Sequence, residues 1–285
     1  MYTTIYFDDV TDKDNFNEVE KIFKNELAKM FEIEHITKDK SCMIIGLGNS
    51  KSTPDALGPK TSQKIIVTKH IYELVGYLEE GYRICSSFIP GVMGTTGIET
   101  SDIIKGIMTY SKPDFLIIID ALASDSIDRV CKTIQITNAG INPGSGIGNS
   151  RKEISKDILD IPVIAIGIPM VVDAVTIVSD TINLMEKHFS YNIKNKDNKK
   201  NKLIPFNMQN YLKEKDLSLN ADEKNYFLGK VGTLKDYEKK SLIFDVLTPI
   251  GYNLMVTPKE VDFLIEKLSD LIATGINKTI HNKNI

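Results

Sequence analysis

The hydrophobic residues near the start of the chain recur at the spacing of an amphipathic helix. Within residues 15–34 the apolar side chains are three or four positions apart, at Val19, Ile22, Phe23, Leu27, Met30 and Phe31. This period places them on one face of a helix, which can then bury that face. We predict a helix over residues 15–34 that packs against the rest of the fold.

After this helix, short continuous apolar runs alternate with stretches of helical periodicity. The predicted strands cover residues 42–47, 83–88, 115–120 and 163–168, and the predicted helices cover 59–77, 100–110 and 173–188. Ile- and Val-rich strands that alternate with helices indicate a parallel sheet with right-handed crossovers. The predicted fold class is α/β, a mostly parallel sheet covered by helices on both faces, in a single domain over residues 1–285.

Two later segments have contrasting patterns. Residues 191–202 are polar and rich in Lys and Asn, which predicts a flexible excursion because they cannot bury enough apolar surface. Thr257-Pro-Lys-Glu260 has the layout of a capping box with Pro at the first helical position. A final, C-terminal helix is therefore predicted over residues 258–274.

Composition and charge narrow the function classes. The 285 residues carry a formal net charge of −3, so no basic field favours direct binding of nucleic acid or of an anionic membrane. No apolar run reaches the roughly 18 residues that span a bilayer, and the first residues lack the layout of a signal peptide. We expect a cytoplasmic protein whose three cysteines, without metal-ligand spacing, are reduced and buried.

The candidate chemistry lies where strands end, because ligands of open parallel sheets bind beyond the carboxyl ends of the strands. Asp120 follows five apolar residues, an expensive position unless the carboxyl is hydrogen-bonded or belongs to a site. Asp55 lies in a glycine-rich loop after the first predicted strand, where Thr-Pro-Asp also suits a turn or a helix cap. Acids at one sheet edge can converge and share a proton, which favours a functional pair.

Many runs along the chain resemble the germination protease family of spore-forming bacteria, over most of its length. They are Gly46-Leu-Gly-Asn49, Thr53-Pro-Asp-Ala-Leu-Gly-Pro59, Pro90-Gly-Val-Met-Gly94, Thr96-Gly-Ile-Glu-Thr-Ser-Asp-Ile-Ile-Lys-Gly106, Lys112-Pro-Asp-Phe115, Ile119-Asp-Ala-Leu-Ala123, Pro143-Gly-Ser-Gly146, Pro162-Val-Ile-Ala-Ile-Gly167, Val171-Val-Asp-Ala-Val-Thr-Ile177 and Asn253-Leu-Met-Val-Thr-Pro-Lys-Glu-Val261.

The resemblance implies an endopeptidase of the spore core that degrades small acid-soluble, DNA-protecting spore proteins at germination. It implies a homotetramer without a cofactor, and a core related to the hydrogenase maturation proteases. The resemblance also implies an atypical aspartic mechanism. The two proposed catalytic acids of the family match Asp55 and Asp120 of this chain.

Two features depart from the family pattern. Similar members of this zymogen family begin with a long extra stretch that includes an inhibitory propeptide. This chain therefore resembles an N-terminally shortened member, which is either a processed or truncated form or a member regulated in another way. The polar stretch Asn49-Ser-Lys-Ser52 replaces the more apolar residues expected there, so the resemblance does not define the substrate subsite at this position.

A mechanism can be written for the acid pair. One carboxyl stays protonated while the other, as general base, activates a water molecule. Backbone N–H groups of the glycine loops are candidates for binding substrate and stabilising the oxyanion. The candidate substrate-binding residues are Gly91, Gly94, Gly97, Gly144 and Gly146.

The alternative function is a metal-binding or catalytically silent sporulation protein on the same scaffold. His70 is the candidate nitrogen ligand beside the two acids, although a lone helical histidine is more often packed or exposed. Both acids lie in intact motifs, which favours the peptidase and a site without metal. His35, His188 and His281 are predicted to be solvated, and Asp173 to cap a helix.

Other catalytic motifs are incomplete. Gly46-Leu-Gly-Asn-Ser-Lys51 lacks the third glycine of a dinucleotide fingerprint, and the loop from Gly144 to Lys152 lacks the lysine position of a phosphate loop. No histidine is placed to activate a serine, and Cys42 and Cys85 are predicted to be buried strand residues.

Overall fold

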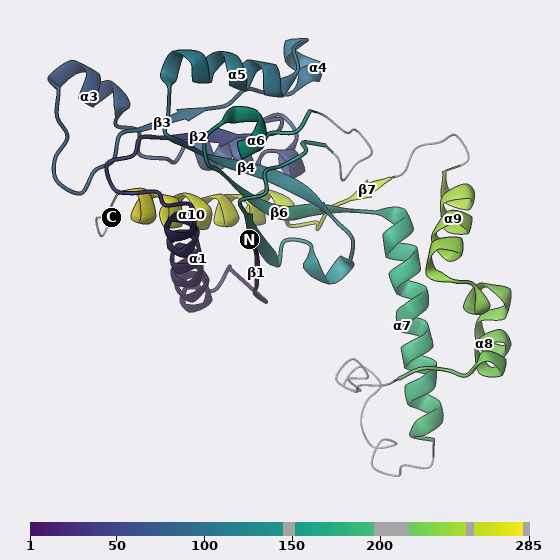
Figure 1. Cartoon of the computed structure of the whole chain (residues 1–285). Helices are drawn as coiled ribbons and strands as arrows, with labels where there is room; N and C mark the ends of the chain where they lie inside the picture. Colours follow the sequence, from purple (N-terminus) through teal and green to yellow (C-terminus); the bar gives the residue numbers. More distant parts are fainter. Residues whose placement is uncertain (145–151, 197–216, 249–253, 282–285) are drawn as a thin grey trace. The chain divides into compact units, whose positions relative to one another are not determined.

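The computed structural model describes residues 1–144, 152–196, 217–248 and 254–281 (Figure 1). The chain forms two compact units. The core unit comprises Met1–Ser124, Asp128–Val171 and Thr257–Ile285, and the helical unit comprises Asp125–Ile127 and Val172–Val256. The expectation of one folding domain over residues 1–285 stays a prediction.

The central sheet is mixed. Its strands are β1 (Tyr2–Tyr6), β2 (Cys42–Gly46), β3 (Cys85–Phe88), β4 (Phe115–Ser124), β5 (Thr133–Thr137), β6 (Val163–Asp173) and β7 (Met255–Val256). The order is β1-β5-β6-β4-β2-β3, with β7 paired to the end of β6. Strand β2 is parallel to both β3 and β4, whereas β5 is antiparallel to β1 and β6. The fold class is α/β with a mostly parallel sheet, as predicted.

One face of the sheet packs on α5 (Thr100–Ser111) and α6 (Lys156–Leu159). Alternate side chains of the strands point to this face, because successive residues of a strand face opposite sides. Met43 and Ile45 of β2 and Ile118 of β4 form a fully buried cluster there with Ile104 of α5. The apolar face of α5 is thereby fixed to the parallel part of the sheet.

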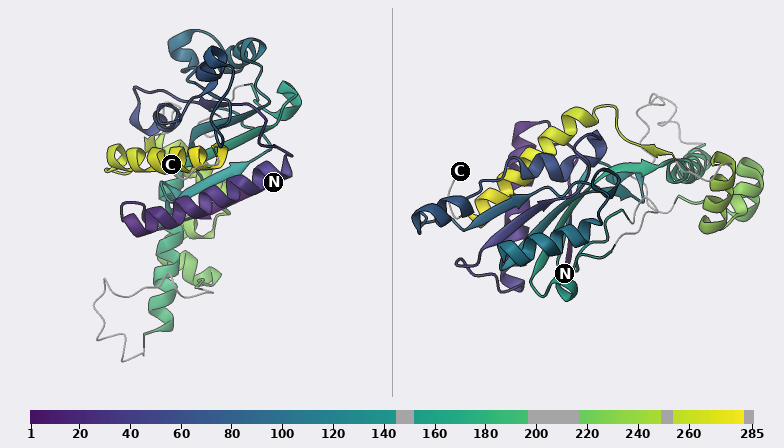
Figure 2. Two further views of the ribbon diagram at one scale, coloured as in Figure 1. Left: turned by 90° about the vertical axis from the view of Figure 1, so that its left-hand side faces the viewer. Right: turned by 90° about the horizontal axis from the view of Figure 1, so that it is seen from above.

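The opposite face is covered by α1 (Lys13–Ile33), α2 (Leu57–Ser62) and α10 (Val261–Ile280). The ring of Phe31 in α1 meets that of Phe115 in β4 edge to face, with centroids 5.3 Å apart. Helices α1 and α10 lie against each other on this side of the sheet (Figure 2). Helices therefore cover both faces, as the sequence predicts.

The prediction of one helix over residues 59–77 is wrong. The segment forms α2 and then α3 (Lys69–Val75), with an irregular stretch between them. In that stretch the Ile66 N–H donates to Asn277 Oδ1 at 3.0 Å, and the Thr68 N–H donates to the Cys85 carbonyl at 2.9 Å. Partners far away in the sequence therefore take the main-chain groups that a continuous helix would need.

The start of the final helix is also mispredicted. Helix α10 begins at Val261, with Glu260 rather than Thr257 at the N-cap, and runs to Ile280. The Thr257 hydroxyl instead donates to the Met170 carbonyl at 2.8 Å. The capping-box residues are thus used for a contact with the end of β6, and the buried helix is longer than the capping pattern suggests.

The helical unit contains α7 (Ala174–Lys194), α8 (Ala221–Thr233) and α9 (Asp236–Leu247). Asp173 caps α7 by accepting the Thr176 N–H at 2.8 Å, as predicted. Helix α7 continues past its predicted end at residue 188, and its residue Tyr191 is buried. The predicted excursion is therefore wrong for residues 191–194, while residues 197–202 lie outside the described part of the chain.

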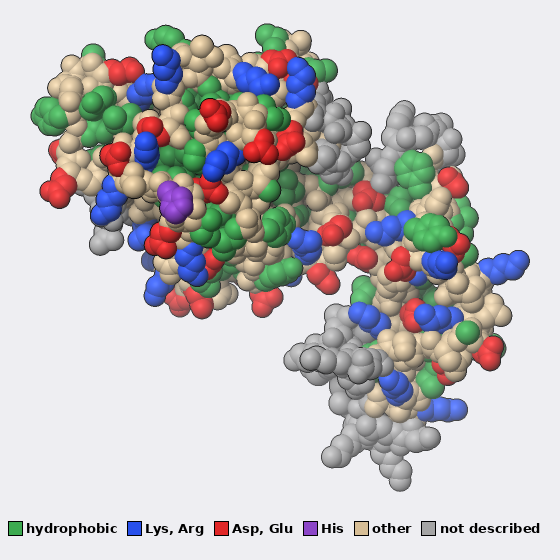
Figure 3. Space-filling view, viewed as in Figure 1, with side chains coloured by type: hydrophobic (Ala, Val, Ile, Leu, Met, Phe, Trp, Pro, Cys, Tyr) green, Lys and Arg blue, Asp and Glu red, His purple; other side chains and the backbone are tan. Residues whose placement is uncertain are grey.

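The cysteines, the helices and the surface charges test three further expectations from the sequence. All three cysteines are free and buried, which confirms that prediction. Among the described helices, none is long and apolar enough to cross a bilayer. On the face shown in Figure 3, acidic and basic side chains are interspersed rather than gathered by sign.

The contact between α1 and α10 gives a stability test. A Cβ at Gly275 of α10 would lie 2.4 Å from the ring of Phe23, which is fully buried and cannot move aside. We expect Gly275→Ala to lower the free energy of unfolding by ~1–3 kcal/mol, the usual cost of overpacking. The Tm measured by differential scanning calorimetry should fall by roughly 2–4 °C for each kcal/mol.

Gly106→Ala is the matched control for this test. Gly106 is an exposed glycine in the interior of α5, and a Cβ there meets nothing within 4 Å. Its Tm should stay the same or rise, because alanine is the better helix former by ~1 kcal/mol. Equal Tm values for both variants would show that the two helices are not in tight contact at Gly275.

Candidate active site

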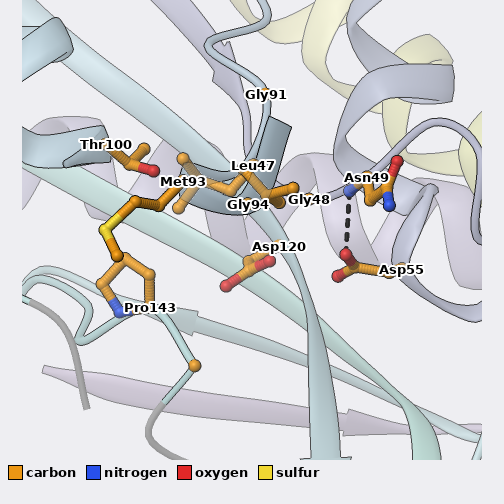
Figure 4. A pocket seen from close by; sticks show the side chains of 12 residues that line it. Leu47, Gly48, Asn49, Asp55, Gly91, Met93, Gly94, Thr100, Asp120 and Pro143 are labelled. Atoms are coloured by element: carbon orange, nitrogen blue, oxygen red, sulfur yellow. Dashed lines mark hydrogen bonds between the residues drawn. The ribbon is translucent and has the colours of Figure 1, made fainter. Parts of the chain in front are cut away.

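A cavity of about 320 Å³ opens in the core unit beside the ends of β2 and β3 and the middle of β4 (Figure 4). It is lined by the segments that follow β2 and β3, by Asp120 within β4, and by the loop at residues 143–144. The lining residues are Leu47, Gly48, Asn49, Asp55, Gly91, Val92, Met93, Gly94, Thr100, Asp120, Pro143 and Gly144. Both predicted catalytic acids therefore face the same space.

Asp120 is held deep in this cavity by strand β4. It follows five fully buried apolar residues and is itself only 6% exposed. One carboxyl oxygen, Oδ1, accepts the N–H of Ala121 at 2.9 Å. The sequence predicts that this strand ends at Asp120, but β4 continues to Ser124. The carboxyl therefore projects from regular strand backbone.

Asp55 ends the short 3₁₀-helix η1 (Thr53–Asp55) and is partly buried. The N–H of Asn49 donates both to Asp55 Oδ2, at 2.8 Å, and to the Asp55 carbonyl, at 3.1 Å. Gly48 has a φ of +112°, and a Cβ there would lie 2.0 Å from the same carbonyl oxygen. The turn after β2 thus wraps closely around Asp55, and only glycine fits at residue 48.

Two further glycines, Gly46 and Gly58, bring α2 close to strands β2 and β4. A Cβ at Gly58 would lie 2.3 Å from the Leu47 carbonyl oxygen and 2.5 Å from that of Ile119. A Cβ at Gly46 would lie 2.3 Å from the Gly58 carbonyl oxygen. Main chain therefore packs directly on main chain, which fixes the segment that carries Asp55 against the strand that carries Asp120.

The two carboxyls differ in electrostatic environment. Burial and the negative charge of Asp55 together raise the pKa of Asp120 to about 8, against the opposing effect of the hydrogen bond from the Ala121 N–H. Burial also raises the pKa of Asp55, against the hydrogen bond from Asn49. Near neutral pH the pair holds a protonated Asp120 beside a more exposed Asp55, which is the arrangement that an acid and a base require.

The five glycines predicted to bind substrate differ in their position relative to the cavity. Gly91, Gly94 and Gly144 line the cavity. Gly97 does not line it, because it ends the short helix α4 (Met93–Thr96) in a left-handed conformation with a φ of +72°. Gly146 lies outside the described residues. A substrate-binding role for the lining glycines stays a prediction.

Sequence reasoning missed several residues of the cavity. Leu47, Val92, Met93 and Pro143 form apolar walls, and Thr100 begins α5 at the rim. The four apolar residues belong to, or adjoin, glycine-rich runs that the sequence already marks as loops. Only the three-dimensional arrangement of these loops distinguishes them from ordinary core residues.

The histidines do not join the acids. His70 is exposed on α3 and is not among the residues that line the cavity. Within the described ranges, no group of three or more His, Cys, Asp or Glu side chains is arranged to hold a metal ion. His281, predicted to be solvated, is fully buried, and its Nδ1 accepts the Arg83 N–H at 3.2 Å.

Comparison with known proteins gives consistent matches. The family model described as germination protease matches residues 1–284. The germination proteases of Bacillus cereus and Bacillus anthracis are each 53% identical over 272 residues, covering 93% of this chain and 73% of theirs. The [NiFe] hydrogenase maturation protease HycI of Thermococcus kodakarensis aligns at 16% identity and a TM-score of 0.32, over 50% of this chain and 80% of its own.

The raised pKa of Asp120 predicts a pH-dependent stability. The folded protein keeps this proton up to about pH 8, whereas the unfolded chain releases it near pH 4, so the free energy of unfolding falls as pH rises between these values. Asp120→Asn has no proton to release at this position, so its stability does not fall in this way. The free energy of unfolding of Asp120→Asn minus that of the unchanged protein, measured by urea titration, should therefore increase by at most ~1.4 kcal/mol per pH unit.

Asp114→Asn provides the control. Asp114 lies before β4. Desolvation opposes ionisation of its carboxyl, but hydrogen bonds from Ser41 and the charge of Lys40 outweigh it and lower the pKa. Its effect on the free energy of unfolding should therefore be constant between about pH 5 and 8. A constant difference for Asp120→Asn as well would mean that Asp120 is ionised throughout this range.

Proposed function

Because this chain belongs to the germination protease family, we propose that it is an aspartic-type endopeptidase with Asp55 and Asp120 as its catalytic carboxyls. The observation that carries the proposal is the pair of carboxyls in one cavity, in which burial and the charge of Asp55 raise the pKa of Asp120 to about 8. Family membership makes the chain a peptidase, and this pair supplies a specific mechanism.

The pKa order assigns the roles. Ionised Asp55 takes a proton from a water molecule, and the water oxygen bonds to the carbonyl carbon of the scissile peptide. Protonated Asp120 gives its proton to the carbonyl oxygen as negative charge develops there. Asp55 then passes its proton to the amide nitrogen, the C–N bond breaks, and Asp120 recovers its proton as the new carboxylic acid forms.

The proposed substrates are the small acid-soluble, DNA-protecting proteins of spores, degraded at germination in the spore core. The family and the 53% identity to Bacillus germination proteases support this proposal. We further propose that the active form is a homotetramer that needs no cofactor. Sedimentation equilibrium and mass mapping of the fragments of a purified small acid-soluble spore protein test these two points.

The central prediction concerns the two acids. Asp55→Asn and Asp120→Asn should each lower kcat for spore protein cleavage by about 10²–10⁴-fold, because each removes a group that transfers a proton. Circular dichroism and assembly should be unchanged. Asp114→Asn, at the opposite end of β4, should retain normal turnover, because that carboxyl is bonded to Ser41 and lies outside the cavity.

Near-normal turnover by either variant would remove that carboxyl from the mechanism. Loss in all three variants would point to a general effect of carboxylates on folding.

A metal-dependent mechanism makes a different prediction. If the acids act as a proton-sharing pair, exhaustive treatment with a chelator should leave the rate of cleavage unchanged, and His70→Ala should do the same. Ligands of a metal must be ionised, so a metal site would instead lose its ion as the pH falls. Activity that is lost on chelation and restored by nickel or zinc would support the metal-binding alternative.

A further inference from the structure

Helix α5 begins at the wall of the cavity with an unused hydrogen-bond donor. Thr100, its first residue, lines the cavity and is only 8% exposed. Among the described residues its hydroxyl has no hydrogen-bond partner. Figure 4 shows Thr100 facing the same space as Asp120, with Met93 between them. The hydroxyl therefore keeps a donor that a ligand in the cavity can use.

Main-chain donors lie beside this hydroxyl. The N–H groups of Asp102 and Ile103 donate to the Glu99 carbonyl, at 3.0 and 3.1 Å. Those of Thr100 and Ser101 have no acceptor in the part of the chain that the structure describes. The first N–H groups of a helix point along its axis and carry a partial positive charge, so α5 presents a cluster of donors to the cavity.

The surrounding charges select the kind of acceptor. Glu99 is the N-cap of α5 and Asp102 lies in its first turn, although Lys152 pairs with Asp102 at 2.9 Å. Asp55 and Asp120 line the same cavity. An anionic ligand would be repelled by the carboxylates of Asp55 and Glu99, whereas a neutral carbonyl oxygen accepts the same hydrogen bonds without that repulsion.

We infer that Thr100 and the first turn of α5 bind a main-chain carbonyl of the peptide substrate, on one side of the scissile bond. This inference rests on the proposed function, because it assigns a substrate-binding role within that site. Apolar Met93 and Pro143 lie in the wall of the same cavity. Thr100 thereby positions the peptide so that its scissile bond lies at Asp55 and Asp120.

Kinetics provide the first test. Thr100→Val keeps the side-chain shape but removes the donor, and should lower kcat/KM for a small acid-soluble spore protein by roughly 3–10-fold, mainly through KM. Thr100→Ser should restore it. Thr61→Val is the matched control, because Thr61 of α2 has a buried hydroxyl without a partner among the described residues and does not line the cavity. Normal kcat/KM for Thr100→Val, or equal losses in Thr100→Val and Thr61→Val, would overturn the inference.

A binding experiment decides the inference without relying on cleavage. Asp120→Asn protein is titrated with an N-acetylated, C-amidated Ala-Gly peptide and, separately, with sodium acetate, while the amide resonances of Thr100 and Ser101 are followed by NMR. Saturable shifts with the neutral peptide support a carbonyl site, provided that the second substitution Thr100→Val weakens binding of the peptide. This result would stand even if Asp120 proves dispensable for activity. Saturable shifts with acetate alone, or with neither compound, overturn it.

Discussion

The close approach of α2 to the ends of β2 and β4 is the contact on which the site depends. It is made by main chain, because Gly46 and Gly58 leave no room for a Cβ between the helix and the strands. Asp55 is three residues before Gly58, and Asp120 directly follows Ile119, whose carbonyl oxygen faces Gly58. A side chain at either glycine would move the two carboxyls apart. The relative position of the acids is therefore set by backbone packing rather than by a bond between them.

Burial in this contact region determines the chemistry of the pair. Asp120 comes from the middle of a strand whose preceding five residues are fully buried, so its ionised form is poorly solvated. Within the described ranges this carboxyl has one hydrogen bond, from the Ala121 N–H, and the protein keeps it neutral near pH 7. Asp55 is more exposed, so it ionises more readily. Such departures from the best stability are expected where a protein carries a function.

The parallel part of the sheet explains why the other walls of the cavity meet the acids. Strands β2, β3 and β4 run in the same direction, so the segments after them arrive at one edge. The segment after β3 supplies the apolar wall and leads into α5. Because Ile104 holds α5 in the buried cluster on the sheet, the donors at the start of that helix have a fixed place beside the cavity. The same core that stabilises the fold thus positions the groups of the site.

The sequence by itself determined the elements whose signals are local. Helical periodicity located α1, apolar runs located β2 and β4, and the position of Asp120 after such a run marked it as a candidate. Only the tertiary structure decided the break between α2 and α3, where Asn277 takes the Ile66 N–H, and the place of Thr100 at the cavity. It also decided that Asp120 is the protonated carboxyl. Hydrogen bonds between distant residues and the loss of solvent around a carboxyl depend on the packed chain, and no local pattern contains them.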